Sequence, residues 1–376
     1  MKIFLTGGGS GGHFYPLIAV ARSIFKIAED ERIAKLKIYL ISDFVTEEQK
    51  ELLFKEDIKF LKVPAGKIRR YFSLLNISDF TKTFLGIVVS FFKIYQILPD
   101  IVFSKGGYSA FPVLFCAKIF RIPIIIHESD SVPGAVNRWS SKWAQKIAVS
   151  FKETIRFFDS GKTIVSGNPV RIQILGGSAK EALLHFNLEE NVPVILILGG
   201  SQGATKINEV ILDLLPELLE KYQIIHQTGE NNYKDIKGRA GVILEKVLLK
   251  HRYHPFPFLN EGSLKNAGKI ASLAISRAGA GSIFEIASWG MPSILIPLLN
   301  SAQNHQRENA YNYAGNGACE VIEEPNLKPH ILFSRVDSIL SSDERMRTMS
   351  EGAKAFSRLD ASEVLAREII KLGTHD

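Results

Sequence analysis

Short runs of consecutive apolar residues alternate with longer stretches of helical periodicity along the chain. In the first half the apolar runs are Lys2–Thr6, Leu36–Ile41, Ile101–Ser104, Ile122–His127 and Lys146–Ser150. Helix-like stretches follow most of these runs, for example Pro16–Ala28 and Pro112–Phe120. Strands that are apolar at nearly every position are typical of a parallel sheet with helices on both faces. We therefore predict an α/β fold.

The same order of elements starts again in the second half. Pro193–Leu198 leads into GGSQGA and a helix that begins near Lys206, as KIFLT leads into GGGSGG at the start. We expect an exposed loop over 228–240 and one or two amphipathic helices over 342–372. The repetition predicts two similar α/β domains that meet within 165–193. The further strands that we expect are Gln223–Gln227, Leu273–Ile275, Ser293–Ile296 and Cys319–Ile322.

Composition and charge narrow the class of protein. The chain has 376 residues, of which 46% are hydrophobic, and this is enough to bury the cores of two domains. A net charge of +7 favours acidic partners such as phosphates or an anionic membrane, without choosing between them. Cys116 and Cys319 predict two buried thiols rather than a disulfide or zinc framework.

The longest apolar run, Phe84–Leu98, raises the question of a membrane span. It is shorter than the ~20 residues that a spanning helix needs, it carries Lys93, and the N-terminus lacks a signal-peptide pattern. We therefore predict a cytoplasmic protein that does not span a membrane, with most of Phe84–Leu98 forming a buried helix over the sheet. Arg69–Leu75, where basic residues adjoin apolar ones, is the better candidate for docking on anionic lipid.

The glycine-rich loop between Gly7 and Gly12 is a candidate anion site. Glycines let a backbone approach a ligand closely, and a helix start offers free N–H groups and positive dipole charge. The loop contains G-x-G-x-x-G, but a dinucleotide site also needs an acidic residue about 20 positions on, and Asp43 comes too late. A structural turn is the alternative. His13 follows the loop directly and is a candidate neutral general base, with a structural role equally open.

Two further clusters follow predicted strands in the first half. SKGGYSAFP, from Ser104 to Pro112, offers a second backbone cradle for an anion. His127, Glu128 and Asp130 stand at the carboxyl end of a strand, where ligands bind in open α/β sheets. A carboxylate there suits a general base or a sugar hydroxyl, and a capping role for Asp130 is the alternative.

The second half carries three clusters of its own. GGSQGA, residues 199–204, offers a serine hydroxyl and backbone N–H groups at a helix start. In 275–290 a helix is expected from near Ser282, and Glu285 on it is placed to accept both hydroxyls of a ribose. The amides of 297–310 suit sugar hydroxyls, and a polar loop that caps the helix after Gln303 is the alternative.

Taken together, these stretches resemble the MurG family of peptidoglycan N-acetylglucosaminyltransferases. The matching segments are GGGSGGHFYPLIAVA, FSKGGYSAFP, HESDSVPGAVNRW, SGNPVR, LGGSQGA, SRAGAGSIFEI and NHQRENA. Each is weak alone, but together they are specific and they extend to about Ala318. The resemblance implies a GT-B fold of two Rossmann-like domains that face each other across a cleft. It implies an acceptor and membrane-docking domain over 1–165, a UDP-GlcNAc domain over 166–345, and a C-terminal helix over 346–376 that packs on the first domain.

The activity that this resemblance implies is an inverting transfer of GlcNAc. The donor would be UDP-GlcNAc, and the acceptor the 4-hydroxyl of MurNAc in lipid I, the undecaprenyl-diphosphate-linked MurNAc-peptide, which becomes lipid II. The protein would lie peripherally on the cytoplasmic face of the plasma membrane and bind no nucleic acid. No cofactor is expected to be obligatory, and the sequence has no Asp-x-Asp motif suited to a metal-bound diphosphate. Alternatives are another GT-B lipid glycosyltransferase, a UDP-sugar epimerase, or a binding protein without catalysis.

The resemblance also implies which residues contact the donor. Arg171 is expected beside the donor diphosphate, Glu285 on the ribose and Gln306 on the GlcNAc hydroxyls. Leu259 is expected to contact the uracil through its backbone. The full donor set is Ser10, Gly11, Gly12, Asp130, Arg171, Ser201, Leu259, Ala280, Gly281, Ser282, Ile283, Phe284, Glu285, Gln303, Asn304 and Gln306.

The acceptor and the general base are expected in the first domain. His13 is the preferred base, with Glu128 second. Asp130 stands where the family has an asparagine, so a hydrogen bond that the amide donated is lost with an ionised carboxylate, and Asn137 is a candidate replacement. Ser10 stands where the family often has threonine. The expected acceptor-binding residues are Gly9, Gly106, Gly107, Tyr108 and Asn137.

Overall fold

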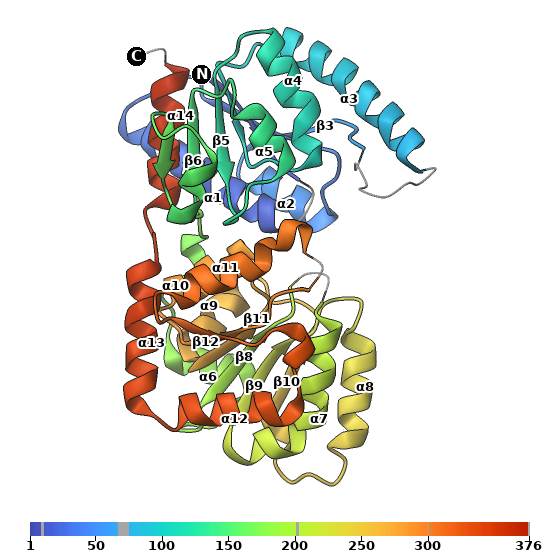
Figure 1. Cartoon of the computed structure of the whole chain (residues 1–376), viewed down its shortest axis with the longest axis vertical. Coiled ribbons are helices and arrows are strands. Elements are labelled where there is room, and N and C mark those ends of the chain that lie inside the picture. The colour runs from blue at the N-terminus through green and yellow to red at the C-terminus, as the bar shows by residue number, and fades with distance from the viewer. Residues whose placement is uncertain (9–10, 67–74, 201–202, 300, 375–376) are drawn as a thin grey trace. The chain divides into compact units, whose positions relative to one another are not determined.

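The chain forms two compact units, seen in a computed structural model that describes residues 1–8, 11–66, 75–200, 203–299 and 301–374 (Figure 1). Unit 1 consists of Met1–Val170 together with Arg358–Asp376, and unit 2 of Arg171–Ser357. The chain therefore leaves unit 1 once and returns to it near its end.

Unit 1 is built on a parallel sheet of seven strands with the order β3-β2-β1-β4-β5-β6-β7. The order reverses between β1 and β4, and in open α/β sheets such a switch point is where ligands bind. The strands are β1 (Lys2–Thr6), β2 (Lys37–Ser42), β3 (Ile58–Lys62), β4 (Ile101–Ser104), β5 (Ile124–Glu128), β6 (Lys146–Val149) and β7 (Thr163–Val165).

Unit 2 repeats this topology with six parallel strands in the order β10-β9-β8-β11-β12-β13. Its switch point lies between β8 and β11, the counterparts of β1 and β4. The predicted α/β class with two parallel-sheet, Rossmann-like domains is confirmed. The strands are β8 (Val194–Leu198), β9 (Gln223–Gln227), β10 (Tyr253–Phe256), β11 (Leu273–Ser276), β12 (Ser293–Leu295) and β13 (Cys319–Val321).

Helices connect the strands in both units. Those of unit 1 are α1 (Gly11–Asp30), α2 (Glu47–Lys55), α3 (Leu75–Ile97), α4 (Phe111–Ile119), α5 (Ala135–Ser140) and α14 (Ala361–Gly373). Those of unit 2 are α6 (Ala179–Phe186), α7 (Thr205–Lys221), α8 (Tyr233–Ile243), α9 (Glu261–Ile270), α10 (Ala280–Ser288), α11 (His305–Ala314), α12 (Pro329–Leu340) and α13 (Asp343–Phe356). Short 3₁₀ segments are η1 (Tyr108–Ala110), η2 (Lys152–Phe157), η3 (Ile172–Ile174), η4 (Lys250–Arg252), η5 (Ala302–Asn304) and η6 (Glu324–Asn326).

The sheet of unit 1 is buried on both faces, because successive residues of a strand point to opposite sides. Ile3 and Leu5 of β1 belong to the core that α1 and α14 cover, whereas Phe4 belongs to the core that α4 covers. This is why the central strands lack the polar alternation of a one-sided sheet.

The C-terminal segment is helical, as predicted for 342–372, but only its last part packs on unit 1 as expected of the helix over 346–376. It forms two helices, with Ser357 extended between them. Met349 of α13 belongs to the core of unit 2, whereas Leu365 and Ile369 of α14 pack with α1 in unit 1. Each helix buries its own apolar face against a different unit, so the boundary lies at 357/358 rather than at 345/346.

The prediction that Phe84–Leu98 forms a mostly buried helix is wrong. α3 packs along a narrow stripe: a Cβ on Gly86 would lie 3.1 Å from Pro112 Cγ of α4 and 2.0 Å from Pro64 O, and Ser90 and Ile94 are buried. On the opposite side Phe84 is 63% exposed and Tyr95 64%. A stripe at every fourth position that begins with the small residues Gly86 and Ser90 lets the helix lie close, while its large aromatic side chains stay outside.

The sequence argument excluded a membrane span because the apolar run is short, but the helix in the structure is longer than that run. Among the described residues, the 20-residue segment Ser78–Ile97 is long and apolar enough to cross a bilayer, and 17% of it is buried. Length and composition alone are a weak criterion, which core helices also meet. The packing of Gly86, Ser90 and Ile94 holds the helix on unit 1 along its length.

The remaining differences concern the polar segment and the sheet edges. The expected loop 228–240 is helical from Tyr233, since Ile236 and Ala240 provide a buried stripe one turn apart. The strands β3, β7 and β10, which the sequence did not indicate, lie at sheet edges. Edge strands are buried less completely and are therefore less uniformly apolar.

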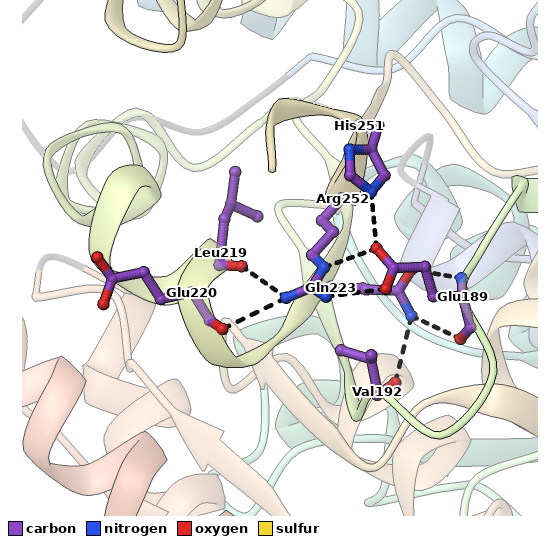
Figure 2. A network of polar contacts seen from close by, with 7 residues as sticks. All are labelled: Glu189, Val192, Leu219, Glu220, Gln223, His251 and Arg252. Atoms are coloured by element: carbon purple, nitrogen blue, oxygen red, sulfur yellow. Dashed lines mark hydrogen bonds and ion pairs between the residues drawn. The ribbon is translucent and has the colours of Figure 1, made fainter. Parts of the chain in front are cut away.

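A polar network fixes the amino ends of the strands in unit 2 (Figure 2). Glu189 accepts hydrogen bonds from Arg252 Nε at 2.7 Å and Arg252 Nη2 at 2.8 Å, and His251 Nε2 lies 2.7 Å from the same carboxylate. Arg252 Nη1 donates to the carbonyls of Leu219 and Glu220 at the end of α7. Gln223 links the backbones of Glu189 and Val192, so one network joins α7, β9 and η4.

Candidate active site

The two glycine loops of unit 1 touch each other at the switch point of the sheet. A Cβ on Gly107 would lie 3.0 Å from Gly8 Cα, and Gly106 and Gly107 have φ angles of +76° and +80°. Residues other than glycine rarely adopt this backbone conformation, and a side chain at Gly107 would push the two loops apart. The structure thus brings together the first loop and the expected acceptor residues Gly106 and Gly107.

His13 lies beside this contact, in the first turn of α1. A Cβ on Gly8 would lie 3.3 Å from His13 Cδ2 and 3.6 Å from His13 Nε2, so the ring lies against the loop. The helix begins at Gly11 rather than at the predicted Pro16, which puts Gly11 and Gly12 at its N-terminus. Gly9 and Ser10 lie outside the described residues.

Glu128 is fully engaged within its own loop. It is buried at the end of β5 and accepts hydrogen bonds from the backbone N–H groups of Asp130 and Gly134, both at 3.0 Å, and from Asn137 Nδ2 at 2.9 Å. Burial and the charge of Asp130 raise the pKa of Glu128 to about 7. A carboxylate with three donors organises the loop from 128 to 137, and His13 is therefore the better candidate for the base.

Asn137 presents an unused acceptor to the second glycine loop. Its Nδ2 also donates to His127 O at 3.1 Å, whereas its Oδ1 has no hydrogen-bond partner among the described residues. A Cβ on Gly106 would lie 2.6 Å from this Oδ1. Because buried acceptors in proteins are almost always satisfied, a donor group on a ligand is the natural partner.

Lys105 is a buried amine that the sequence argument did not single out. Its Nζ donates to Asn168 Oδ1 at 2.7 Å and lies 2.9 Å from His127 Nδ1. His127 Nε2 in turn lies 2.9 Å from Gly167 O. Burial lowers the pKa of His127, and the charge of Lys105 lowers it further. The available signal was a lysine directly after β4, whose sequence IVFS predicts a buried strand.

Tyr108 and Asp130 lie near the same edge with partners of their own. Tyr108 Oη donates to Asp43 Oδ2 at 2.8 Å, and burial together with this bond raises the pKa of Tyr108 to about 12. Asp130 O accepts from Thr154 Oγ1 at 3.1 Å. Asp130 therefore has a backbone role in its loop as well as a side chain near Glu128.

In unit 2 the glycine loop after β8 corresponds to the first loop of unit 1. Gly200 and Gly203 have φ angles of +73° and +79°, and a Cβ on Gly203 would lie 2.7 Å from Thr228 O. The loop thus requires glycine at this position to pass the end of β9. Ser201, the expected donor contact, lies outside the described residues.

The N-terminus of α10 is the clearest open helix start among the described parts of unit 2. A Cβ on Gly279 or Gly281 would meet no atom within 4 Å, so there is open space beside these two glycines, whereas Ala280 between them is buried. Ile283 and Phe284 are buried, which leaves only their backbone for a ligand. Free N–H groups and the helix dipole favour an anion here.

Arg171 and Glu285 are paired with each other. Arg171 Nη2 donates to Glu285 Oε1 at 2.7 Å, and Arg171 Nε donates to the same oxygen at 3.2 Å. Glu261 Oε1 lies 4.0 Å from Arg171 Nη1. Two residues expected to contact different parts of the donor are thus adjacent, and a ribose would share Glu285 with the guanidinium.

The amide-rich loop before α11 is held in an uncommon backbone conformation. Gln303 and Asn304 both have φ of +56°, and their side chains are exposed. Such residues cost about 1–3 kcal/mol each and cluster at ligand-binding sites. Gln306 Oε1 accepts from Leu298 N at 3.0 Å, which fixes the loop.

Leu259, expected to contact the uracil through its backbone, lies outside this loop. Its N–H donates to Gln227 Oε1 at 3.1 Å.

Both units match models of one enzyme family. Residues 3–149 match the glycosyltransferase family 28 N-terminal domain, and residues 194–365 match the family 28 C-terminal domain. These matches contain the loops described above in both units.

A curated relative and two solved structures are similar over nearly the whole chain. The UDP-N-acetylglucosamine–N-acetylmuramyl-(pentapeptide) pyrophosphoryl-undecaprenol N-acetylglucosamine transferase of Treponema denticola is 34% identical over 367 residues, which is 94% of this chain and 93% of that protein. The crystal structure of Acinetobacter baumannii MurG has a TM-score of 0.72 and 22% identity, covering 98% of this chain and 99% of that one. A putative UDP-N-acetylglucosamine 2-epimerase from Listeria monocytogenes has a TM-score of 0.71 and 14% identity, covering 100% and 98%. The shared fold therefore does not separate transferases from epimerases, whereas the sequence identity does.

Proposed function

The chain belongs to the family 28 UDP-N-acetylglucosamine–N-acetylmuramyl-(pentapeptide) pyrophosphoryl-undecaprenol N-acetylglucosamine transferases, and on this premise we propose that it moves GlcNAc from UDP-GlcNAc to lipid I. The observation that carries the proposal is the meeting of two glycine loops beside His13 and Asn137 in unit 1.

The reaction needs one bond formed and one broken at the anomeric carbon. The 4-hydroxyl of MurNAc attacks that carbon from the side opposite UDP, its proton passes to a base, and the bond from carbon to the diphosphate oxygen breaks. His13 is the proposed base, because its ring lies beside the loop that would hold the acceptor. Inversion of the anomeric centre follows from the single displacement.

The residues of unit 2 are proposed to bind UDP-GlcNAc. The open start of α10 offers N–H groups to the diphosphate, and the positive charge of Arg171 lies beside Glu285 to support the leaving UDP. Glu285 accepts from the ribose, and the loop of Gln303 to Gln306 contacts the sugar hydroxyls. We propose that no metal is required, so a chelator should leave turnover intact.

One assay tests the proposed reaction against its rivals. The protein is incubated with UDP-GlcNAc and a short-chain lipid I analogue, and the products are separated by mass and chromatography. A disaccharide with a β-1,4 bond supports the proposal. Free UDP-ManNAc would identify an epimerase, and transfer to a diacylglycerol but not to the analogue would identify another lipid glycosyltransferase.

We also propose that unit 1 docks peripherally on anionic lipid, at the cytoplasmic face of the plasma membrane, through the outer face of α3. Phe80, Phe84 and Phe92 are exposed there, and Lys82 is exposed on the same helix. Large apolar side chains next to basic ones are typical of helices that lie in a membrane interface. The earlier candidate, Arg69–Leu75, has most of its residues outside the described part.

Vesicle sedimentation tests this docking. Phe84→Ser with Phe92→Ser should lower binding to vesicles that contain phosphatidylglycerol, by about tenfold or more from the lost apolar burial. Leu184→Ser, an exposed apolar site in unit 2, is the matched control and should bind as the unmodified protein does. Equal binding by the double variant and the control would reject α3 as the docking surface.

A further inference from the structure

Lys105 places an amine on the protein side of the two glycine loops of unit 1. Its backbone N–H donates to Thr6 O at 2.8 Å, and Gly106 and Gly107 follow it directly. A Cβ on Gly7 would lie 3.2 Å from Lys105 Cβ. The residue is 1% exposed, so its side chain runs behind the loops rather than into solvent.

Among the described residues, the groups within hydrogen-bond distance of the amine carry no formal negative charge. These are Asn168 Oδ1 and His127 Nδ1, while Ser150 Oγ lies 3.4 Å from the far nitrogen of His127. The carboxylates of Glu128 and Asp130 act on Lys105 through the electric field, and they do not neutralise it by direct contact. On α1, the charge of His13 acts on His127 in the same way.

A lysine in this setting is costly unless it serves a ligand. Burial lowers the pKa of Lys105 to about 7, because water that would solvate the ammonium is excluded. An amine that titrates near neutral pH, at the ligand-binding edge of a parallel sheet, is typical of a functional group. An anion placed in the loops would raise its affinity for a proton.

We propose that Lys105 positions the acceptor: its amine takes up a proton when the diphosphate of the lipid-linked acceptor binds in the Gly7–Gly8 and Gly106–Gly107 loops, and the resulting charge holds that diphosphate. The inference rests on the proposed function, because it needs a diphosphate-bearing acceptor in unit 1. One proton passes from solvent to Nζ on binding and returns when the product leaves. Lys105 does not touch the reacting atoms and is a positioning residue.

The proposal fixes the sign of a pH dependence. The protonated amine favours the anion, so the acceptor binds best below pH about 7 and its KM rises as the pH passes above the pKa of the free amine. The KM for UDP-GlcNAc should not show this rise with pH. A lysine with only a structural role would shift neither profile.

Calorimetry with the full chain measures the proton directly. A soluble short-chain lipid I analogue is titrated just above neutral pH in two buffers of different ionisation enthalpy. The unmodified protein should take up part of a proton, and Lys105→Met should take up none. In steady-state kinetics Lys105→Met should raise the acceptor KM about tenfold through the lost charge interaction, while kcat and the KM for UDP-GlcNAc stay near normal.

Two further variants keep the test decisive if Lys105→Met does not fold. Asn168→Asp keeps the volume and the lysine but places a carboxylate against the amine, which holds it protonated and should abolish the uptake. His13→Ala should retain the uptake, which excludes that imidazole as its source. Circular dichroism checks the fold of each variant.

Several outcomes would overturn the inference without touching the proposed function. These are normal proton uptake or a normal acceptor KM in Lys105→Met, full uptake in Asn168→Asp, or an uptake produced by UDP but not by the acceptor analogue or inorganic diphosphate. By contrast, an unmodified protein that forms no disaccharide at all would overturn the proposed function.

Discussion

Two clusters of ionisable side chains, one in each unit, use similar residue types in opposite ways. In unit 1, Lys105, His127 and Glu128 are enclosed at the carboxyl ends of β4 and β5. In unit 2, Glu189, His251 and Arg252 contact one another directly at the amino ends of the strands and stay partly in solvent (Figure 2).

The difference lies in what balances each charge. In unit 1 burial dominates, and it brings the pKa values of Lys105 and Glu128 to about 7 from opposite directions. In unit 2 the hydrogen bonds from Arg252 and His251 hold the pKa of Glu189 at about 2. An ion pair with a direct contact keeps both groups charged near neutral pH and supports the fold. Burial without an ion pair instead moves the pKa of a group toward neutral pH, where it can gain or lose a proton.

The largest effect is expected at His13, next to the unit 1 cluster. His13→Ala should lower kcat by about 10²-fold or more, because it removes the imidazole proposed to take the proton of the attacking hydroxyl. The melting temperature should change little. His330→Ala, at an exposed histidine of α12, is the matched control in the same turnover assay. Near-normal turnover in His13→Ala would remove it from the mechanism.

Glu128→Gln should give the next largest effect. The amide turns one oxygen into a donor that faces the N–H of Asp130, or that of Gly134 and the amide of Asn137. Losing one charge-assisted bond of about 1.5–3 kcal/mol should lower kcat/KM for the acceptor roughly tenfold. Glu344→Gln, at an exposed carboxylate, is the control. A loss as large as that of His13→Ala would instead make Glu128 the base.

Arg252→Met should affect stability and not activity. It removes two hydrogen bonds to Glu189 and two to the carbonyls that end α7, so thermal unfolding should begin at a lower temperature. Turnover with both substrates should stay at the normal value. Arg239→Met, whose partner Asp235 lies one turn away on α8, should shift the melting temperature less. A loss of turnover in Arg252→Met would contradict the view that the unit 2 cluster supports stability alone.

The smallest effect is expected in the pH dependence of stability. The folded pKa of Glu189 lies below its ordinary value of 4.5, so its stabilising contribution is complete above that value and is lost as the pH falls toward about 2. Glu189→Gln should therefore flatten part of the loss of stability measured by acid titration. Glu230→Gln, at an exposed glutamate, should leave the curve unchanged. An unaltered curve in Glu189→Gln would show that the pair contributes nothing in solution.

The sequence predicted the central strands better than the edges. β1, β4 and β9 have the expected bounds, and for β1 and β4 the reason is that strands buried on both faces are apolar at most positions. β3 and β10 were not predicted, because their sequences IKFLK and YHPF are not uniformly apolar. Edge strands tolerate such lysines and prolines. The prediction for α3 was wrong because an apolar run was taken as a sign of burial. In the structure part of this run faces solvent and only a stripe of it is packed.

The position of the candidate site was predictable, whereas the state of its side chains was not. Gly106 stands just after β4, and His13 and Glu285 lie on the helices that follow β1 and β11; the carboxyl ends of parallel strands share one edge of a sheet. Nothing in the spacing showed that Glu128 is saturated by its own loop or that Arg171 is paired with Glu285. The Arg171–Glu285 pair joins segments far apart in the chain, and the hydrogen bonds of Glu128 depend on how the loop from 128 to 137 folds back on it.

The sequence by itself determined the fold class, the two-domain repeat and the family, because apolar patterning and loop motifs are local properties of the chain. Only the tertiary structure decided that α3 exposes its phenylalanines and that Lys105 is enclosed next to the first glycine loop. Burial and the pKa shifts that it causes arise from packing between distant segments, which no single stretch of sequence contains.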